Sequence, residues 1–583
     1  MKKFTITTYV TLVASILFSI LSVHFKLDVS FFAFPLSAAF TGVLVWALYF
    51  ELLKKQNTKF LAASIKLLQY LPYVLLLAFV FRRAGKVETY YWYDIVTVLL
   101  WCAALIGRWT LLFWLNPKRI SRLNPDWEKL VAKKSGGIIA KKLTVKGILY
   151  EIVDWIDAIV QAVFLVLLFQ IFVFQLYVIP SESMVPSFLI KDRVVVFKTA
   201  SGPKFPMSPV GLPCVKKYKR GDVVVFRNPQ YGDGGKDEKN RQNDIRFVAS
   251  QLIYMLSFTT ININVDSHGQ PKADPLVKRV CGVPGEQLVM QDGTLYARTK
   301  DSDEWKPVSQ DNKFAAWNLS SLQNKYRDSI KEYPLSSDDF DTLLSVEEAR
   351  RALDLKLASI ECNSIYNSMA SYVKNTTSDT EFSFDSYKIY AGFTGIAKNI
   401  TTKDGYAWFK NYMTGWTKSM PANMAEITLD PYTEANYRLN VMYKLYSGRL
   451  FLRTAQLLAQ GKDQTSFMQD EAFVKAYTDF RNVAFYISIL DQRNMPVFPK
   501  NTEDGKPSYI PAKNYFMMGD NRFNSLDMRH MAGFYEAPLT AFDEYSVVYQ
   551  SCLEQKYVPQ NRILGTAAYR FWPLNRTGVV KTR

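Results

Sequence analysis

The stretch LYVIPSESMVPSFL, residues 176–189, places serines and two prolines directly after a long apolar run. Proline has no amide hydrogen and restricts the residue before it, so Pro180 is expected to end a helix. The apolar run, residues 158–179, carries no charge and is long enough to cross a bilayer. We therefore expect Ser181 and Ser183 to lie on an extended segment just outside a membrane.

Four more apolar runs come earlier in the chain, and together they predict a membrane anchor. A cleavable signal peptide in the first run is disfavoured, because no small-x-small cleavage site precedes the next run. The remainder of the chain is mixed in composition, which is typical of an aqueous part. The four runs cover residues 4–23, 29–50, 60–81 and 95–115, within an anchor of residues 1–115.

The loop at residues 116–150 predicts the orientation of the anchor. It carries nine Lys or Arg residues against two acidic ones, and the positive-inside rule assigns such a loop to the cytoplasm. The fifth span, within residues 151–179, then leads out of the cytoplasm, so the N-terminus lies inside and the rest of the chain outside. Arg82, Arg83 and Lys86 would also lie outside, which conflicts with the rule.

Composition narrows the function class. The formal charge of +18 suggests nucleic acid, but no aromatic-plus-basic recognition motif occurs and many basic residues lie in one loop. Five cysteines without CxxC spacing argue against a zinc ribbon or a dense disulfide scaffold, and leave the pairing of any single disulfide open. The chain has three histidines, which limits histidine-based catalysis and metal ligation.

A second stretch, PLVKRVCGVPGEQL at residues 275–288, predicts a strand that enters a Pro-Gly turn. With a period of two, Lys278 lies on one face between Leu276 and Val280. If that face is buried, desolvation lowers the lysine pKa, and a neutral amine can take a proton from a serine hydroxyl. A lysine that points to solvent from an edge strand is the alternative.

A third stretch, YFMMGDNRFNSLDMRHMAGF at residues 515–534, predicts a strand followed by a loop held by side-chain hydrogen bonds. An exposed turn is one alternative. A calcium loop built on Asp520, Asn524 and Asp527 is another, although the EF-hand glycine and terminal glutamate are missing.

Taken in order, five stretches resemble the motifs of bacterial type I signal peptidase, a membrane-bound peptidase with a Ser-Lys dyad. These stretches are IPSESMVPSFLIKDRVVVFK, YKRGDVVVF, VKRVCGVPGE, MGDNRFNSLDMR and VPQNRILGTAAYRFWPLNR. Each motif is moderately specific, but the ordered set after a membrane span is highly specific. The sequence departs from the pattern at Phe523 and Met528, where the family usually has polar residues.

The resemblance implies a role for each matching residue. Ser183 would be the nucleophile and Lys278 the general base. The Ser181 hydroxyl and the Ser183 amide would form the oxyanion hole. Ser525 would hydrogen-bond to Lys278 and orient it, and Asp527 and Arg529 would form a supporting ion pair.

Three further assignments come from the residues themselves. Arg279 lies on the opposite strand face from Lys278, and we expect it to pair with Asp520. Met184 and Val277 are candidates for the substrate pockets, because they adjoin the two proposed catalytic residues.

The implied fold is a set of transmembrane helices followed by a mainly β peptidase domain outside the cytoplasm, in two parts at residues 180–298 and 494–583. A mainly helical insertion of residues 299–493 separates the parts, with helices expected at residues 345–373, 432–459 and 466–490. Shorter insertions are expected at residues 227–274 and 535–557. A packed cap without chemistry is favoured for the large insertion over a docking module for the secretion translocon.

The implied function is removal of signal peptides from membrane-inserted pre-proteins, at the periplasmic face of a bacterial inner membrane, without metal or cofactor. The expected partners are signal peptides and the lipid bilayer, with no nucleic acid. A hydrolase that uses His530 or His268 and an inactive secretion-associated scaffold are the alternatives.

Overall fold

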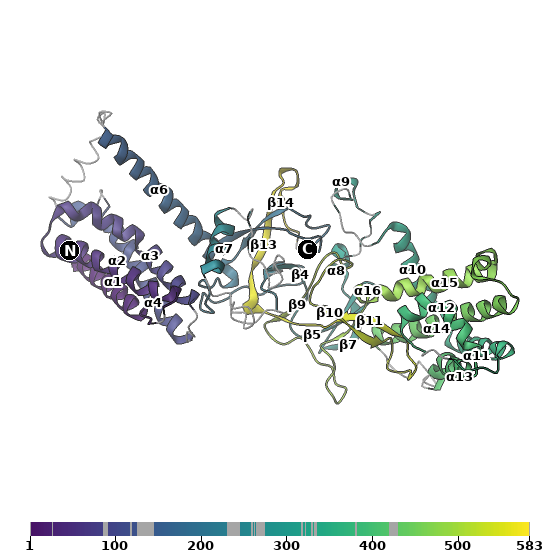
Figure 1. Cartoon of the computed structure of the whole chain (residues 1–583). Helices are drawn as coiled ribbons and strands as arrows, with labels where there is room; N and C mark the ends of the chain where they lie inside the picture. The colour runs from purple at the N-terminus through teal and green to yellow at the C-terminus, as the bar shows by residue number, and fades with distance from the viewer. Residues whose placement is uncertain are drawn as a thin grey trace.

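A computed structural model of the chain has three parts, which are an N-terminal helical bundle, a central β domain and a second helical region (Figure 1). It describes all residues except 1, 26, 86–90, 117–118, 125–144, 230–244, 258–260, 262, 264–274, 316, 318, 321, 328–329, 331–334, 379–381, 419–429 and 582–583. Most of the basic loop and His268 therefore lie outside the described residues.

Five of the described helices are long and apolar enough to cross a membrane. The first four, α1 to α4, pack together, and α6 lies beside α3 (Figure 1). Their bounds are α1 Lys2–Leu21, α2 Ala33–Val45 continued by a π-helical stretch Trp46–Lys54, α3 Leu61–Ala84, α4 Tyr91–Trp114 and α6 Val145–Phe172.

Helix α1 has small polar residues on its buried face and large apolar residues on its exposed face. Thr8, Thr11, Ser15 and Ser19 are buried, and each hydroxyl donates to the carbonyl four residues earlier. Ile6, Val10, Val13, Leu17 and Ile20 are exposed. Small residues at helix contacts and apolar residues facing outward are typical of helices packed within lipid.

The fifth apolar run does not form one helix, which corrects the prediction for residues 158–179. Helix α6 ends at Phe172, and the following residues form strand β1, Phe174–Val178. Apolar content does not separate a lipid-facing helix from a buried strand, and this stretch is rich in aromatic and β-branched residues, which favour strands. Pro180 therefore follows a strand, and the helix ends well before it.

The β domain contains an eight-stranded antiparallel sheet in which β4 is an interior strand. The strand order is β1-β2-β13-β3-β4-β9-β12, and β14 pairs with β13. Strand β3 is buried along its whole length, as expected for an all-apolar run inside a sheet. The bounds are β2 Arg193–Phe197, β3 Val223–Phe226, β4 Leu276–Gly282, β9 Asn514–Met518, β12 Val558–Pro559, β13 Ile563–Trp572 and β14 Gly578–Val579.

A four-stranded sheet, ordered β7-β6-β5-β8, and a β10-β11 hairpin complete the domain. Residues of the first two sheets share one apolar core, which includes Val280, Leu288 and Met517. The bounds are β5 Glu286–Gln291, β6 Thr294–Thr299, β7 Ser302–Pro307, β8 Met495–Phe498, β10 His530–Pro538 and β11 Val548–Leu553.

The region between β7 and β8 is mainly helical and has its own apolar core. Helix α10 begins earlier than predicted, because Ser336 and Asp339 form the capping box. The single helix predicted for residues 345–373 is interrupted at Leu353, which separates α10 from α11. The prediction for residues 432–459 matches α14, and the prediction for residues 466–490 contains all of α15. The bounds are α8 Ser309–Ala315, α9 Asn324–Arg327, α10 Ser337–Ala352, α11 Leu355–Met369, α12 Ser386–Ile400, α13 Lys403–Thr414, α14 Pro431–Ala459, α15 Glu471–Ser488 and α16 Leu490–Arg493.

A loop of the β domain docks onto the end of the helical bundle. Phe205 packs edge-on against Phe79 and Trp101, within the same core as the bundle helices. Beside it, Arg83 donates to the carbonyl of Met207, and the Ser208 hydroxyl donates to Asp94 at 2.6 Å. Arg83 and Asp94 also face each other at 3.6 Å, with both side chains buried.

This buried pair makes docking testable. Arg83→Ala would leave Asp94 buried without its cation, and breaking such a pair costs about 3–5 kcal/mol. We expect faster tryptic cleavage after Lys204, in the docked loop, measured by mass spectrometry of the detergent-solubilised protein. The control variant is Lys59→Ala, which removes an exposed side chain. Equal cleavage rates in the wild type, Arg83→Ala and Lys59→Ala would contradict the docking.

Candidate active site

Ser183 and Lys278 meet inside the β domain although they lie far apart in sequence. Lys278 Nζ and Ser183 Oγ are 2.7 Å apart, and both residues are buried. Ser183 lies in a turn, with Val185 N bonded to the Glu182 carbonyl and Phe188 N to that of Met184. The expected extended conformation is therefore wrong, because the chain folds back directly after β1 to reach β4.

Lys278 comes from an interior strand of the sheet, which removes the edge-strand alternative. Strand β4 pairs with β3 on one side and β9 on the other, and Lys278 is 3% exposed. Burial lowers the pKa of Lys278 to about 8. The charges of Asp527 and Asp520 oppose this shift, and that of Arg529 adds to it. With this pKa, about a tenth of the amine is neutral at pH 7, a far larger fraction than for an ordinary lysine.

The loop after β9 contacts the Ser183 turn through its backbone. Asn521 N donates to the Ser183 carbonyl at 3.1 Å. A Cβ at Gly519 would lie 2.4 Å from that same carbonyl oxygen and 2.2 Å from Ser525 Oγ. Only glycine fits at position 519, so the loop can approach the Ser183 turn closely.

Ser525 lies at the site, but its hydroxyl does not make the expected hydrogen bond to Lys278. Ser525 Oγ is buried and has no hydrogen-bond partner in the described part of the chain. The Lys278 amine is instead directed to Ser183 Oγ. Ser181 Oγ lies 3.3 Å from the same oxygen, so two polar groups converge on the Ser183 hydroxyl.

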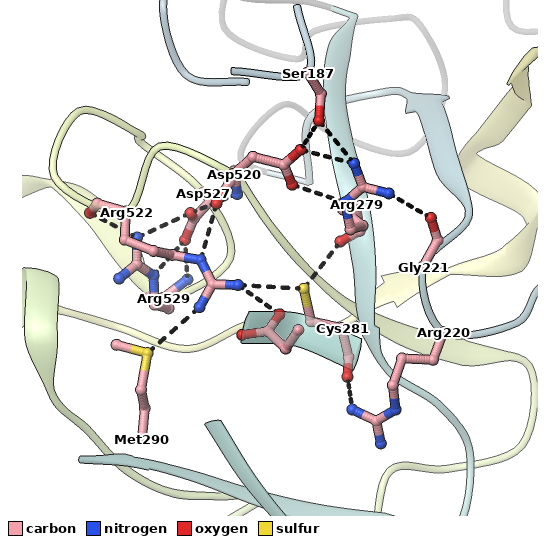
Figure 2. Close-up of polar contacts among 12 residues, drawn as sticks. Ser187, Arg220, Gly221, Arg279, Cys281, Met290, Asp520, Arg522, Asp527 and Arg529 are labelled. Carbon is pink, nitrogen blue, oxygen red and sulfur yellow. Dashed lines mark hydrogen bonds and ion pairs between the residues drawn. The ribbon is translucent and has the colours of Figure 1, made fainter. Parts of the chain in front are cut away.

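Arg279 pairs with Asp520, as expected from its place on the opposite face of β4. Its guanidinium donates to both carboxylate oxygens, at 2.8 and 2.7 Å (Figure 2). Ser187, from the turn that carries Ser183, donates to Asp520 at 2.5 Å. This contact, which sequence reasoning missed, ties the turn to β4 and to the loop after β9. In the sequence, this contact was indicated only by a polar residue, Ser187, that follows Pro186 close to Ser183.

Asp527 and Arg529 form the second expected ion pair, at 2.9 Å and fully buried. Burial opposes ionisation of Asp527, but Arg529 and the hydrogen bond from Gly519 N hold its pKa well below the usual range. Figure 2 also shows Arg522, whose guanidinium reaches Met290 and Cys281. Arg522 donates to the Gly519 carbonyl as well, so the loop is braced at both ends.

The remaining candidates are the two proposed pocket residues, Met184 and Val277, and His530. Met184 is buried in an apolar cluster with Tyr177 and Val194, and Val277 packs against that cluster. Their role as substrate pockets remains a prediction.

The nitrogens of His530 face the backbone carbonyls of Ser525 and Asp491, at 3.3 and 3.1 Å. Burial lowers the pKa of His530. Within the described part of the chain, neither hydrogen bond of its ring reaches Ser183.

The Arg279–Asp520 pair gives a stability prediction. Asp520→Ala would leave a buried guanidinium uncompensated, at a cost of about 3–5 kcal/mol. We expect a clearly lower unfolding temperature in detergent, measured by calorimetry. Glu361→Ala is the control, because its bidentate pair with Arg449 is more than a third exposed and such pairs contribute about 1 kcal/mol or less. Equal shifts for both variants would contradict the pairing argument.

Comparison with known proteins agrees with this geometry. The profile of the family described as "Signal peptidase, peptidase S26" matches residues 152–347 and 453–572, which is more than half of the chain. Signal peptidase I of Bacillus licheniformis is 28% identical over 151 residues, covering 26% of this chain and 53% of that protein. Signal peptidase I S of Bacillus subtilis (strain 168) is 27% identical over 154 residues, covering 26% and 54%. Signal peptidase I of Leptolyngbya laminosa is 35% identical over 72 residues, covering 12% and 24%.

The chain thus spans about half the length of the two Bacillus relatives. The profile match includes the turn with Ser183, strand β4 with Lys278 and the loop after β9. With more than half of its length matched, this chain belongs to the signal peptidase family, peptidase S26.

Proposed function

We propose that this protein is a membrane-bound serine endopeptidase that removes N-terminal signal peptides from secreted pre-proteins. The observation that carries the proposal is the 2.7 Å contact between Ser183 Oγ and a buried Lys278 amine. A hydroxyl is a weak nucleophile unless a base takes its proton, and a desolvated amine is a suitable base. The family membership supports the reaction class.

The mechanism follows from the two groups. Neutral Lys278 takes the Ser183 proton while Ser183 Oγ attacks the carbonyl after a small residue of the substrate. The Ser183 amide and the Ser181 hydroxyl stabilise the oxyanion. Lys278 then gives its proton to the departing amine of the mature protein. Water activated by Lys278 releases the signal peptide from the acyl-enzyme.

The location follows from the helices. Five helices have the length and composition of membrane spans, and the exposed apolar face of α1 is suited to lipid. The basic loop before α6 supports a cytoplasmic N-terminus and a periplasmic β domain in the inner membrane. Arg83, which would then lie outside, is paired with Asp94 and docked against the β domain, so its charge does not oppose this orientation.

The substrate would bind as an added strand. Strand β1 lies at the end of the large sheet and, among the described strands, pairs with β2 alone. An exposed edge can accept an extended peptide through its backbone groups. Because β1 follows α6 directly, the substrate's cleavage site would lie close to the bilayer, as expected for a peptide whose own apolar segment is inserted in the membrane.

The proposal predicts that cleavage requires both groups. We expect the purified wild-type protein to cleave a membrane-inserted pre-protein after a small residue, and Ser183→Ala and Lys278→Ala to lose at least about 1000-fold in rate. N-terminal sequencing of the product identifies the bond. Cleavage by Lys278→Ala at the wild-type rate would exclude Lys278 as the base, and failure of the wild type on several pre-proteins would favour a scaffold.

The pKa of Lys278 predicts the pH dependence. Only the neutral amine can accept a proton, so the rate should be at its plateau above pH 8 and fall as pH decreases below the pKa of about 8. The expected loss is about tenfold per pH unit, measured as kcat/KM. Lys198→Met is the control, because burial also lowers the pKa of Lys198 to about 8, away from Ser183. A flat profile between pH 8 and 6 would contradict the lysine base.

A further inference from the structure

Part of the helical insertion lies directly against the proposed active site. We call it the insertion arm, defined by Asp311, Phe314, Trp317 and Leu322. Sequence reasoning assigned this stretch to an insertion without chemistry. The arm nevertheless contacts both elements that converge on Ser183, which are the loop after β9 and the turn that carries the serine.

The arm contacts two of the arginines near the site, Arg522 in the loop after β9 and Arg279 on β4. Asp311 accepts a hydrogen bond from Arg522 at 2.6 Å, and both side chains are at most 5% exposed. The ring of Phe314 lies 3.5 Å from Arg279 Cζ, on the guanidinium that binds Asp520. The arm thus adds a carboxylate and an aromatic face to the two arginines that brace this loop.

Trp317 is linked to Ser183 by two hydrogen bonds that share one peptide unit. Its Nε1 donates to the carbonyl of Asp520 at 3.0 Å. That carbonyl belongs to the same peptide unit as Asn521 N, which donates to the Ser183 carbonyl at 3.1 Å. A peptide unit is planar, so fixing the direction of its carbonyl also fixes the direction of its N–H. Hydrogen bonds in such a chain also polarise one another.

The ring of Trp317 also packs on the serine turn. It contacts a small apolar cluster of Val185, Leu189 and Leu322, the first two of which belong to the turn. Val185 is fully buried. The indole therefore fixes the turn from the apolar side and the opposing peptide unit from the polar side.

We propose that Trp317 is a positioning residue for Ser183, through the peptide unit between Asp520 and Asn521. This inference rests on the proposed peptidase function, because it assigns the helical insertion a part in the alignment of the Ser183 hydroxyl with Lys278. Loss of the indole N–H frees that peptide unit to rotate, and the turn then samples positions in which Ser183 Oγ is displaced from the amine. Displacements of about 1 Å at a reacting atom cost up to about 100-fold in rate.

Trp317→Phe separates the two contributions, since it removes the N–H donor and keeps an aromatic ring in the apolar cluster. The matched control is Trp416→Phe. Trp416 is fully buried in the helical insertion, and its Nε1 donates to the Met413 carbonyl at 2.8 Å, remote in sequence from the site.

The measurement is single-turnover cleavage of a pre-protein with enzyme in excess, over a range of enzyme concentrations. The rate constant at saturation reports the chemical step, and the half-saturating concentration reports binding and the folded fraction. We expect Trp317→Phe to lower the rate constant by about 10- to 100-fold with unchanged half-saturation. A merely structural defect would raise the half-saturating concentration and leave the rate constant unchanged, and this result would overturn the proposal. Trp416→Phe is expected to keep the wild-type rate constant.

Hydrogen exchange provides a readout that does not depend on activity. In Trp317→Phe, peptides that cover residues 519–527 and 182–190 should exchange faster than in the wild type, while those from α14 should not change. Unchanged exchange in both segments would overturn the inference whether or not cleavage is seen. A wild type that fails to cleave while these segments respond would instead contradict the proposed function and leave the positioning contact established.

Discussion

The structure depends on one amine that is kept out of water. Lys278 lies on an interior strand of the large sheet, and burial is the main cause of its lowered pKa. Asp520 and Asp527 oppose this effect, because a nearby negative charge favours the ammonium form. Asp520 is paired with Arg279 at 2.7 Å, and Asp527 is paired with Arg529 at 2.9 Å. The two ion pairs therefore stiffen the site while limiting the stabilisation of a charged Lys278, which is what a lysine base requires.

Much of the fold could be predicted because its signals are local. Long uncharged runs indicated the bundle helices, and the alternating pattern and Pro-Gly turn of residues 275–288 indicated β4. The end of α6 could not be predicted, since its last apolar residues suit a lipid-facing helix and a buried strand equally well. Contacts between the parts were also invisible. Phe205 gave no signal that it would enter the bundle core, because its partners Phe79 and Trp101 come from separate helices.

The site was predictable where a motif supplied an order of residues or where the strand period placed a side chain on one face. The strand period placed Lys278 and Arg279 on opposite faces, which led to the Arg279–Asp520 pair. Periodicity does not encode the turn at Ser183, the contact of Ser187 with Asp520, or the lack of a partner for the Ser525 hydroxyl among the described residues, because all three depend on how distant segments meet. The insertion arm shows the same limit. Asp311 and Trp317 look like ordinary residues of a helical region, and their contacts with Arg522 and Asp520 span about two hundred positions of sequence.

The central claim is that desolvation lowers the pKa of Lys278, so that part of the amine is neutral at physiological pH. The most direct test is NMR titration of the lysine side-chain amines in the folded protein, with Lys278→Met and Lys198→Met spectra to assign the two lysines whose pKa is lowered to about 8. The account predicts that the Lys278 amine titrates near pH 8. Titration near the ordinary lysine value of about 10.4 would show that the protein does not lower the pKa of this amine, and would contradict the account.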